Sequence, residues 1–334
     1  MNAKRICRIG AVAFVIALAG AGEQSFGQSL GELRSGVRQF LSDSRFAASF
    51  SGLVALSDEF ELSGATYQIG GPARTDNSDT ELSTLALPFR QRFHPWEDAA
   101  ISIYSEGVLG YAQAHERWND IYGGLLPGLA TSLNTDWTTY GGLFGVGPEF
   151  RVSDQFRIAP ILNVGVARIE NHADYGGPGA ASSAALFDGL AFNWNGWTVS
   201  RGGAARAEWD HPLGKDYELQ VVGRYDLRWT QTFATDDRAQ EFSDRLQLAT
   251  LRADVVGPTG LKPFGRTLDW RTLAGYRHFI EGNIYDVRDV VLLGCGLEYD
   301  VQGTLPLVSR VSVKGGVILG QNISGYTLGA CFSF

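Results

Sequence analysis

Two histidines lie close in sequence to carboxylate residues in polar stretches of the chain. Of all the residues in the sequence, these are the best candidates for acid–base catalysis. The clusters are His115 with Glu116 and Asp120, and His172 with Glu170 and Asp174. A histidine next to a carboxylate can act as a general acid or base. No motif for an activated Ser, Thr or Cys nucleophile accompanies either cluster. A solvated loop accounts for them more simply, so the sequence indicates no catalytic residue.

Other charged residues alternate with apolar ones, so they would share one face of an extended strand. The residues expected to line the interior of a closed sheet are Arg206, Arg224, Arg228, Arg271, Arg277, Asp226, Asp269 and Glu298. Basic and acidic residues are nearly balanced over the whole inward face. They would therefore either pair across the interior or contact small solutes. Cysteine spacing indicates no metal or redox site, and no cofactor is expected.

The elements that must carry these residues are strands. In the stretch YELQVVGRYDLRW, residues 217–229, apolar and polar residues alternate over the whole length. Aromatic residues bracket such segments: Tyr217 and Trp229 in this one, Trp197 and Trp209 in the one before it. A soluble β-sandwich shows the same period. Aromatic residues at both strand ends instead favour a transmembrane barrel, whose girdles lie at the two membrane interfaces.

The fold class predicted is all-β: a transmembrane antiparallel β-barrel of about twelve strands, with a short N-terminal helix. Single-chain bacterial barrels have even strand numbers, so one of thirteen candidate segments is miscounted, and fourteen strands remain an alternative. Short turns such as 152–155 and 211–216 alternate with longer connections at 112–136, 170–194 and 230–243. The candidate segments are 46–57, 59–70, 82–93, 98–112, 137–151, 156–169, 196–209, 217–230, 244–256, 266–280, 288–301, 306–319 and 325–334.

Composition limits the partners. Charged residues make up only 19% of the 334 residues and glycines number 42, which suits many strands and turns. Acidic residues outnumber basic ones by 36 to 28, which argues against a nucleic-acid partner. Outside residues 1–22, no apolar run approaches the roughly 20 residues of a membrane-spanning helix.

The N-terminal region divides into two segments ahead of a barrel at 45–334. Residues 1–22 have basic residues, a short apolar run and small residues, which together predict a secretory signal peptide. In residues 23–44, apolar side chains recur at helical spacing, so an amphipathic helix is expected there. Such a helix would either thread and plug the barrel or lie on its periplasmic side.

The last residues alternate again, with Tyr326, Leu328, Phe332 and Phe334 on one face. This pattern resembles the C-terminal signature of Gram-negative outer-membrane proteins. The resemblance implies an outer-membrane location, with the lipid bilayer, the barrel-assembly machinery and periplasmic chaperones as partners. Together with the preceding helix and the size, the chain resembles the translocator domain of autotransporters, in the solitary form without a passenger domain. We therefore expect it not to secrete cargo of its own.

Three functions follow from this reading. The first is an autotransporter-like barrel with a narrow, salt-bridged lumen and a structural, assembly or surface role. The alternative is a porin-like diffusion channel for small solutes. A hydrolase at the extracellular rim, built on the histidine clusters, is a minor alternative. Cys295 and Cys331 fall on opposite faces of strands that are two apart, so both thiols are expected to be free.

Overall fold

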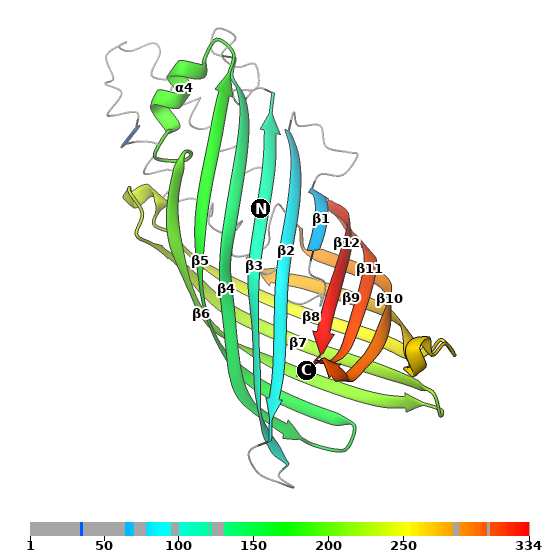
Figure 1. Cartoon of the computed structure of the whole chain (residues 1–334). Coiled ribbons are helices and arrows are strands. Elements are labelled where there is room, and N and C mark those ends of the chain that lie inside the picture. Colours follow the sequence, from blue (N-terminus) through cyan, green and yellow to red (C-terminus); the bar gives the residue numbers. More distant parts are fainter. Residues whose placement is uncertain are drawn as a thin grey trace.

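The computed structural model describes residues 34–35, 64–69, 78–94, 100–119, 121, 130–282, 287–305 and 308–333. Within them, twelve strands pair with antiparallel neighbours in chain order (Figure 1). The first strand, β1 (Gly64–Ile69), pairs with both β2 (Ser78–Phe93) and β12 (Ile323–Ser333), so the sheet closes into a barrel. The predicted all-β, twelve-stranded barrel is confirmed. The other strands are β3 (Ile101–Trp118), β4 (Ser132–Arg151), β5 (Phe156–Gly176), β6 (Trp194–Leu213), β7 (Tyr217–Phe233), β8 (Ser243–Pro258), β9 (Leu268–Glu281), β10 (Asp289–Leu305) and β11 (Val308–Gly320).

The two ends of the barrel differ in their connections. The segments that follow β3, β5 and β7 span residues 119–131, 177–193 and 234–242, and we call this the loop end. At the opposite end, which we call the turn end, β4 and β6 are followed by residues 152–155 and 214–216 alone, and the longest connection, after β8, spans residues 259–267. This asymmetry is typical of membrane barrels, which have short turns on one side and longer loops on the other.

Alternation along each strand separates an outer face from a lumen face. On β7, Tyr225 and Trp229 face outward and are 39% and 43% exposed. Asp226 and Arg228, which lie between them in the sequence, face the lumen and are each 3% exposed. Successive side chains of a strand point to opposite faces. The orientation of one residue therefore determines which residues of that strand face lipid and which face the lumen.

The strands extend further at the loop end than apolar alternation predicts. The prediction placed 112–136 and 170–194 in connections, but the strands occupy 112–118, 132–136, 170–176 and 194. The ladder continues through them, because His115 lies opposite Asp136 and Asp136 lies opposite His172. Outward side chains are polar in this extension, so a pattern based on apolar residues stops too early. The expected loop positions of both histidines are therefore wrong.

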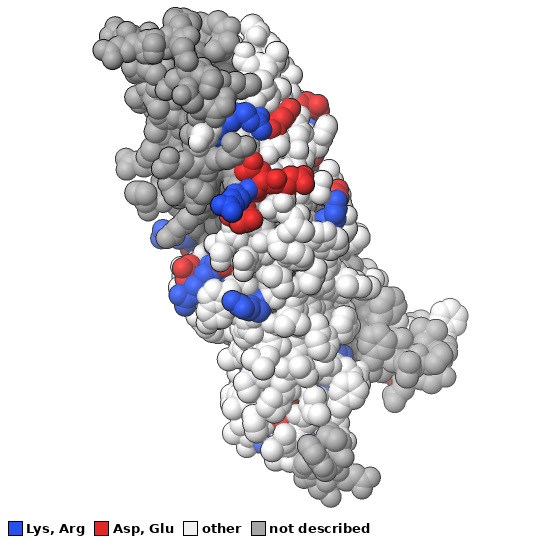
Figure 2. All heavy atoms as spheres, turned by 90° about the vertical axis from the view of Figure 1, so that its left-hand side faces the viewer, with Lys and Arg blue, Asp and Glu red and all other residues white. Residues whose placement is uncertain are grey.

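An apolar band with aromatic edges covers the outer face below this extension. Trp197 and Trp209 on β6, and Tyr217 and Trp229 on β7, are all exposed at the edges of the band. At about 3.3 Å per residue and a tilt of about 40°, Trp197 and Trp209 are about 30 Å apart along the barrel axis, comparable to the band of a membrane barrel. Figure 2 shows charged side chains gathered over the upper half of one face, above a lower half that is nearly free of them.

One α-helix lies in the β5–β6 connection, and the sequence analysis did not predict it. This helix, α4 (Ala180–Phe187), has the alanine-rich sequence AASSAALF, which favours helix formation. Edge-on ring contacts join Phe192, which follows the helix, to Phe187 at 6.3 Å and to Tyr175 of β5 at 6.4 Å. These contacts hold the connection against the rim of the barrel. None of the described helices is long and apolar enough to cross a membrane.

Several predictions fall outside the described residues. They concern the signal peptide 1–22, most of the segment 23–44 and the candidate strand 46–57; the candidate strand 59–70 corresponds to β1. Residue Phe334 and the side chains of Cys331 and Phe332 also lie outside this part. Cys295 is exposed on β10 as a free thiol.

Candidate functional site

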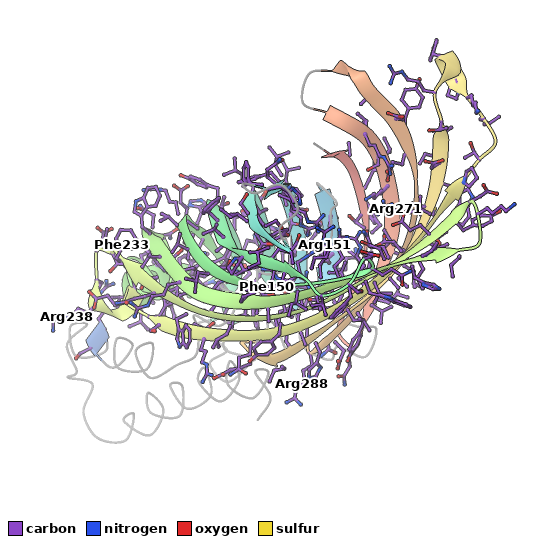
Figure 3. The ribbon with its side chains drawn as sticks, turned by 90° about the horizontal axis from the view of Figure 1, so that it is seen from below. Phe150, Arg151, Phe233, Arg238, Arg271 and Arg288 are labelled. Atoms are coloured by element: carbon purple, nitrogen blue, oxygen red, sulfur yellow. The ribbon has the colours of Figure 1, made fainter. Side chains whose placement is uncertain are left out.

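The lumen is the candidate site, and the predicted residues occupy lumen-facing positions on their strands. Arg206, Asp226, Arg228, Arg277 and Glu298 are buried, whereas Arg224, Asp269 and Arg271 are partly buried. Figure 3, seen from below, shows the sheet as a curved wall that carries side chains on both faces. Their contacts divide the lumen into a charged layer near the turn end and an apolar layer near the loop end.

Glu208 on β6 is the centre of the charged layer. Its carboxylate accepts hydrogen bonds from Arg92 Nη2 at 2.7 Å, from Arg157 Nη2 at 2.9 Å and from Arg206 Nη1. Arg92 also donates through Nε to Glu149 Oε1 at 2.9 Å. Arg92 belongs to β2, four strands away from β6 in the sheet, so this ion pair crosses the lumen.

A second crossing joins β7 to β3. Arg224 donates through Nη1 to Glu106 Oε2 at 2.7 Å, and its Nε and Nη2 bind the carboxylate of Asp226 at 2.8 Å. The Tyr104 hydroxyl donates to Glu106 Oε2 at 3.1 Å. The guanidinium carbon of Arg206 lies 5.3 Å from the centre of the Tyr104 ring, a cation–π distance. The two crossings therefore share Tyr104 and form one network.

Along the other wall, charges pair between neighbouring strands. Glu298 on β10 accepts from Arg271 on β9 at 2.9 Å and from Arg310 on β11 at 2.8 Å. Arg252 Nε donates to Asp254 Oδ2 of its own strand β8 at 2.5 Å. Asp269 lies opposite Glu298 in the β9–β10 ladder. These two carboxylates are like charges side by side, but the arginines Arg271 and Arg310 on either side of Glu298 offset them, so this wall has no large field of one sign.

Apolar side chains form the layer nearer the loop end, which the sequence analysis missed. Every strand except β7 contributes to one buried cluster, in which Leu82, Leu246 and Val290 are 0% exposed. The rings of Trp137 and Trp194 pack edge-on at 6.0 Å within it. The lumen face is mostly apolar here, although Arg277 is fully buried within this layer opposite Val290. Polar-in alternation therefore does not describe this half of the barrel.

A small cavity separates the two layers. Its lining includes glycines of β3, β4 and β5, together with Arg228 and the hydroxyl-bearing residues Thr139, Thr198, Ser200 and Thr230. Ser200 and Thr230 hydrogen-bond to each other at 2.8 Å. Within the described part of the chain, Thr139 Oγ1 is buried without a hydrogen-bond partner. Most of the cavity lining is nevertheless apolar, with Val108, Leu143 and Ile169 among the lining residues.

Both histidines lie outside the lumen, on the outer face of the extended strands. Glu116 is on the opposite face from His115 and accepts a hydrogen bond from the buried Thr135 Oγ1 at 3.3 Å, so the expected cluster is split. His115 Nδ1 is 2.8 Å from Asp136 Oδ1, and Arg117 Nε donates to His115 Nε2 at 2.9 Å. His172 and Asp174 are 71% and 76% exposed, with 3.6 Å between His172 Nε2 and Asp174 Oδ1. Asp120, the other expected partner of His115, lies outside the described residues. Within those residues, no group of three His, Cys, Asp or Glu side chains could hold a metal.

Arg92, Glu149 and Tyr104 are network residues that the sequence analysis did not single out. Arg92 alternates with the outward Phe93 at the end of β2, and Glu149 alternates with Phe150 on β4. This alternation was the available signal, but both residues stand at strand ends, where the pattern is shortest.

Comparison with known proteins agrees with this architecture. Residues 68–252, more than half of the chain, match the family described as the solitary outer membrane autotransporter beta-barrel domain. No curated protein matches the chain. Among solved structures, the beta domain of the Bordetella autotransporter BrkA is 15% identical, with a TM-score of 0.46 over 81% of this chain and all of that one.

The translocator domain of the autotransporter NalP from Neisseria meningitidis is 13% identical, with a TM-score of 0.46 over 89% of this chain and 99% of that one. These structural likenesses are distant, and the family match carries the assignment. The chain belongs to the solitary outer membrane autotransporter β-barrel family, and it is a protein of the Gram-negative outer membrane.

Proposed function

We propose that this barrel is closed to solutes and serves a structural, assembly or surface role in the outer membrane. The observation that carries the proposal is the pair of ion-pair crossings, Arg92 to Glu208 and Arg224 to Glu106, which join strands four apart. A selective pore needs open lumen lined by groups that hold a permeating solute. Here the charged groups hold one another.

The apolar layer supports the same proposal. Its side chains come from nearly the whole circumference and are buried, so they stack a second barrier above the charged network. Hydrophobic constrictions close pores by excluding water. A solute would have to pass both layers. The charged layer blocks it because its groups are already paired with one another, and the apolar layer blocks it because it excludes water.

Contacts of the N-terminal segment also support closure. Arg34, inside the predicted amphipathic helix, is helical and donates to the carbonyl oxygens of Ala185 at 2.7 Å and Asp188 at 2.9 Å. Both carbonyls lie at the C-terminal end of α4, where a cation is favourable. This contact places Arg34 at the loop end, which favours the plug over a helix on the periplasmic side.

Planar-bilayer recordings test the closed barrel. Purified full-length protein should show no stepwise conductance, while a conducting porin reconstituted in parallel shows that the bilayer reports channels. A chain that lacks residues 23–44 separates the two barriers: silence would assign closure to the barrel side chains, and conductance would assign it to the N-terminal segment. Strong conductance of the full-length chain would contradict closure.

A porin-like channel for small solutes is the second candidate. The cavity between the layers favours it, because Thr139, Thr198, Ser200 and Thr230 present hydroxyl groups beside Arg228. Arg271 and Arg277 would then be further contact residues for an anionic solute. Swelling of protein-loaded liposomes in neutral sugars would distinguish this function from a closed barrel.

A hydrolase remains the minor candidate, built on His115 and His172. His115 has the Asp136 carboxylate that would orient it as a base, but the described residues near it include no activated nucleophile of the kinds that covalent catalysis uses. The non-enzymatic barrel is the simpler proposal.

We further propose that the last strand recruits the barrel-assembly machinery, after periplasmic chaperones deliver the chain. On β12, Tyr326 and Leu328 are 64% and 68% exposed on the outer face, in alternation with Phe332 and Phe334 of the sequence. Deleting Phe334 should reduce folded protein in the outer membrane several-fold, measured by heat-modifiable gel migration of membrane fractions. Shortening the 234–242 connection should not, and equal losses would contradict a signal in this strand.

A further inference from the structure

A basic and aromatic patch lies on the outer face of β5 to β8, at the loop-end edge of the apolar band. Two rows of directly opposed residues form it. Arg168, Trp197 and Phe233 make the first row, across β5, β6 and β7. In the second row, Trp229 on β7 stands between Arg201 on β6 and Arg245 on β8.

The two tryptophans act as platforms for the flanking cations. The guanidinium carbon of Arg168 lies 5.6 Å from the Trp197 ring centre, and that of Arg245 lies 5.8 Å from the Trp229 ring centre. Arginine over a tryptophan face is held by the ring quadrupole, which orients the charge without neutralising it. Tryptophan at this level also marks the headgroup region of the membrane.

Arg201 differs from the other two arginines in its partners. Arg168 binds Glu170 Oε1 at 2.6 Å, and Arg245 Nε lies 3.5 Å from Glu281 Oε2. Among the described residues, Arg201 is exposed and has no hydrogen-bond or ion-pair partner. Its neighbours on the outer face are Val164, directly opposite on β5, and Trp229. An unpartnered cation amid lipid-facing apolar side chains is stable where it reaches an anionic headgroup.

Below Arg201, the outer face of β6 presents only small side chains. Gly203, Ala205 and Ala207 follow it toward the turn end, and Leu162 on β5 and Leu227 on β7 both stand opposite Gly203. Leu162 is 75% exposed. These small residues, flanked by larger side chains, form a shallow track that leads from Arg201 into the apolar band. An acyl chain attached to a headgroup at Arg201 would run in the same direction.

We propose that this patch binds a membrane lipid with a phosphomonoester headgroup, the phosphate lying between Arg201 and Arg245 and an acyl chain along Gly203, Ala205 and Ala207. Charge complementarity selects the headgroup, because a phosphomonoester has the oxygens to accept from two guanidinium groups at once. Trp229 separates the two arginines by the width of two strand spacings, about 9.6 Å, which suits one phosphate between two extended side chains. The proposal rests on the outer-membrane location and is independent of whether the lumen is closed.

Native mass spectrometry of the full-length protein in a neutral detergent tests the proposal, with phosphatidic acid and diacylglycerol of identical acyl chains as probes. The wild-type chain should retain phosphatidic acid at least tenfold more tightly than diacylglycerol, and Arg201→Gln should lose most of that difference. Arg201→Lys should keep part of it, because the charge remains. The matched control is Arg288→Gln, since Arg288 is an exposed arginine outside the patch (Figure 3).

Three outcomes would overturn the proposal. Equal retention of the two lipids by the wild-type chain would show that phosphate is not recognised. Unchanged preference in Arg201→Gln, with native heat-modifiable migration, would place the recognition elsewhere. Displacement of bound phosphatidic acid by millimolar inorganic phosphate would identify a site for the free anion rather than for a lipid.

Discussion

Replacing Glu208 with glutamine should lower the free energy of unfolding by about 3–5 kcal/mol, the range for removing one partner of a buried ion pair. Glu208 is 2% exposed and accepts from three arginines, one of which spans the lumen. Glutamine keeps the shape of the side chain but removes the charge. The buried guanidinium of Arg206 would then lose the carboxylate that it contacts. Urea unfolding of protein reconstituted in phospholipid vesicles measures the change.

Glu170→Gln is the matched control for that experiment. Glu170 also pairs with an arginine of its own strand, Arg168, but it is 44% exposed on the outer face of the loop-end extension. Exposed ion pairs contribute little to stability, so this variant should unfold almost as the wild type does. Equal destabilisation by the two substitutions would show that the lumen network does not hold the barrel together.

Replacing Gly325 with alanine should disturb the seam where the barrel closes. Gly325 faces the lumen on β12, opposite Tyr67 of β1, and a Cβ there would lie 2.2 Å from the Thr66 carbonyl oxygen. Overpacking of this kind costs about 1–3 kcal/mol where neighbours can move. Here the obstacle is backbone, and the β1–β12 ladder has only the six paired positions of β1. We expect a lower heat-modifiable fraction and a lower urea midpoint.

Gly315→Ala controls for the loss of a glycine on a neighbouring strand. Gly315 lies on β11, and the nearest atom to its Cβ would be the Thr327 carbonyl oxygen at 3.7 Å, an ordinary contact. This variant should fold to the same extent as the wild type. If both glycine variants folded equally well, the seam would be looser than the β1–β12 register implies.

Alternation predicted the fold because it is a local property of each strand. Residues 217–229 carry their outer and lumen faces in their own order of side chains, and Asp226 and Arg228 lie where that order places them. The partners of those charges depend on tilt and register, which no single strand contains. Arg92 and Glu208 are 116 positions apart, and Arg224 and Glu106 are 118 apart.

The apolar layer was hidden for a related reason. Leu82 and Ile169 face the lumen, the face that was expected to be polar, and Trp194, which was expected in the connection 170–194, faces it too. Where both faces of a strand carry apolar residues, the sequence of that strand alone does not tell which face contacts lipid. The positions of the neighbouring strands are needed. Likewise, the outward His115 and Asp136 look like loop residues, because polar residues on a strand above the membrane break the apolar pattern.

The loop-end extension also sets a height above the cell surface. β5 contains 21 residues, which at about 3.3 Å per residue and a tilt of about 40° reach about 50 Å, about 20 Å more than the apolar band. The paired strands therefore extend past the membrane and hold α4 on the order of 20 Å above the lipid headgroups. A macromolecule approaching from outside would meet this raised platform before it met the bilayer, and a tag inserted in residues 177–193 would stand at a defined distance from the membrane.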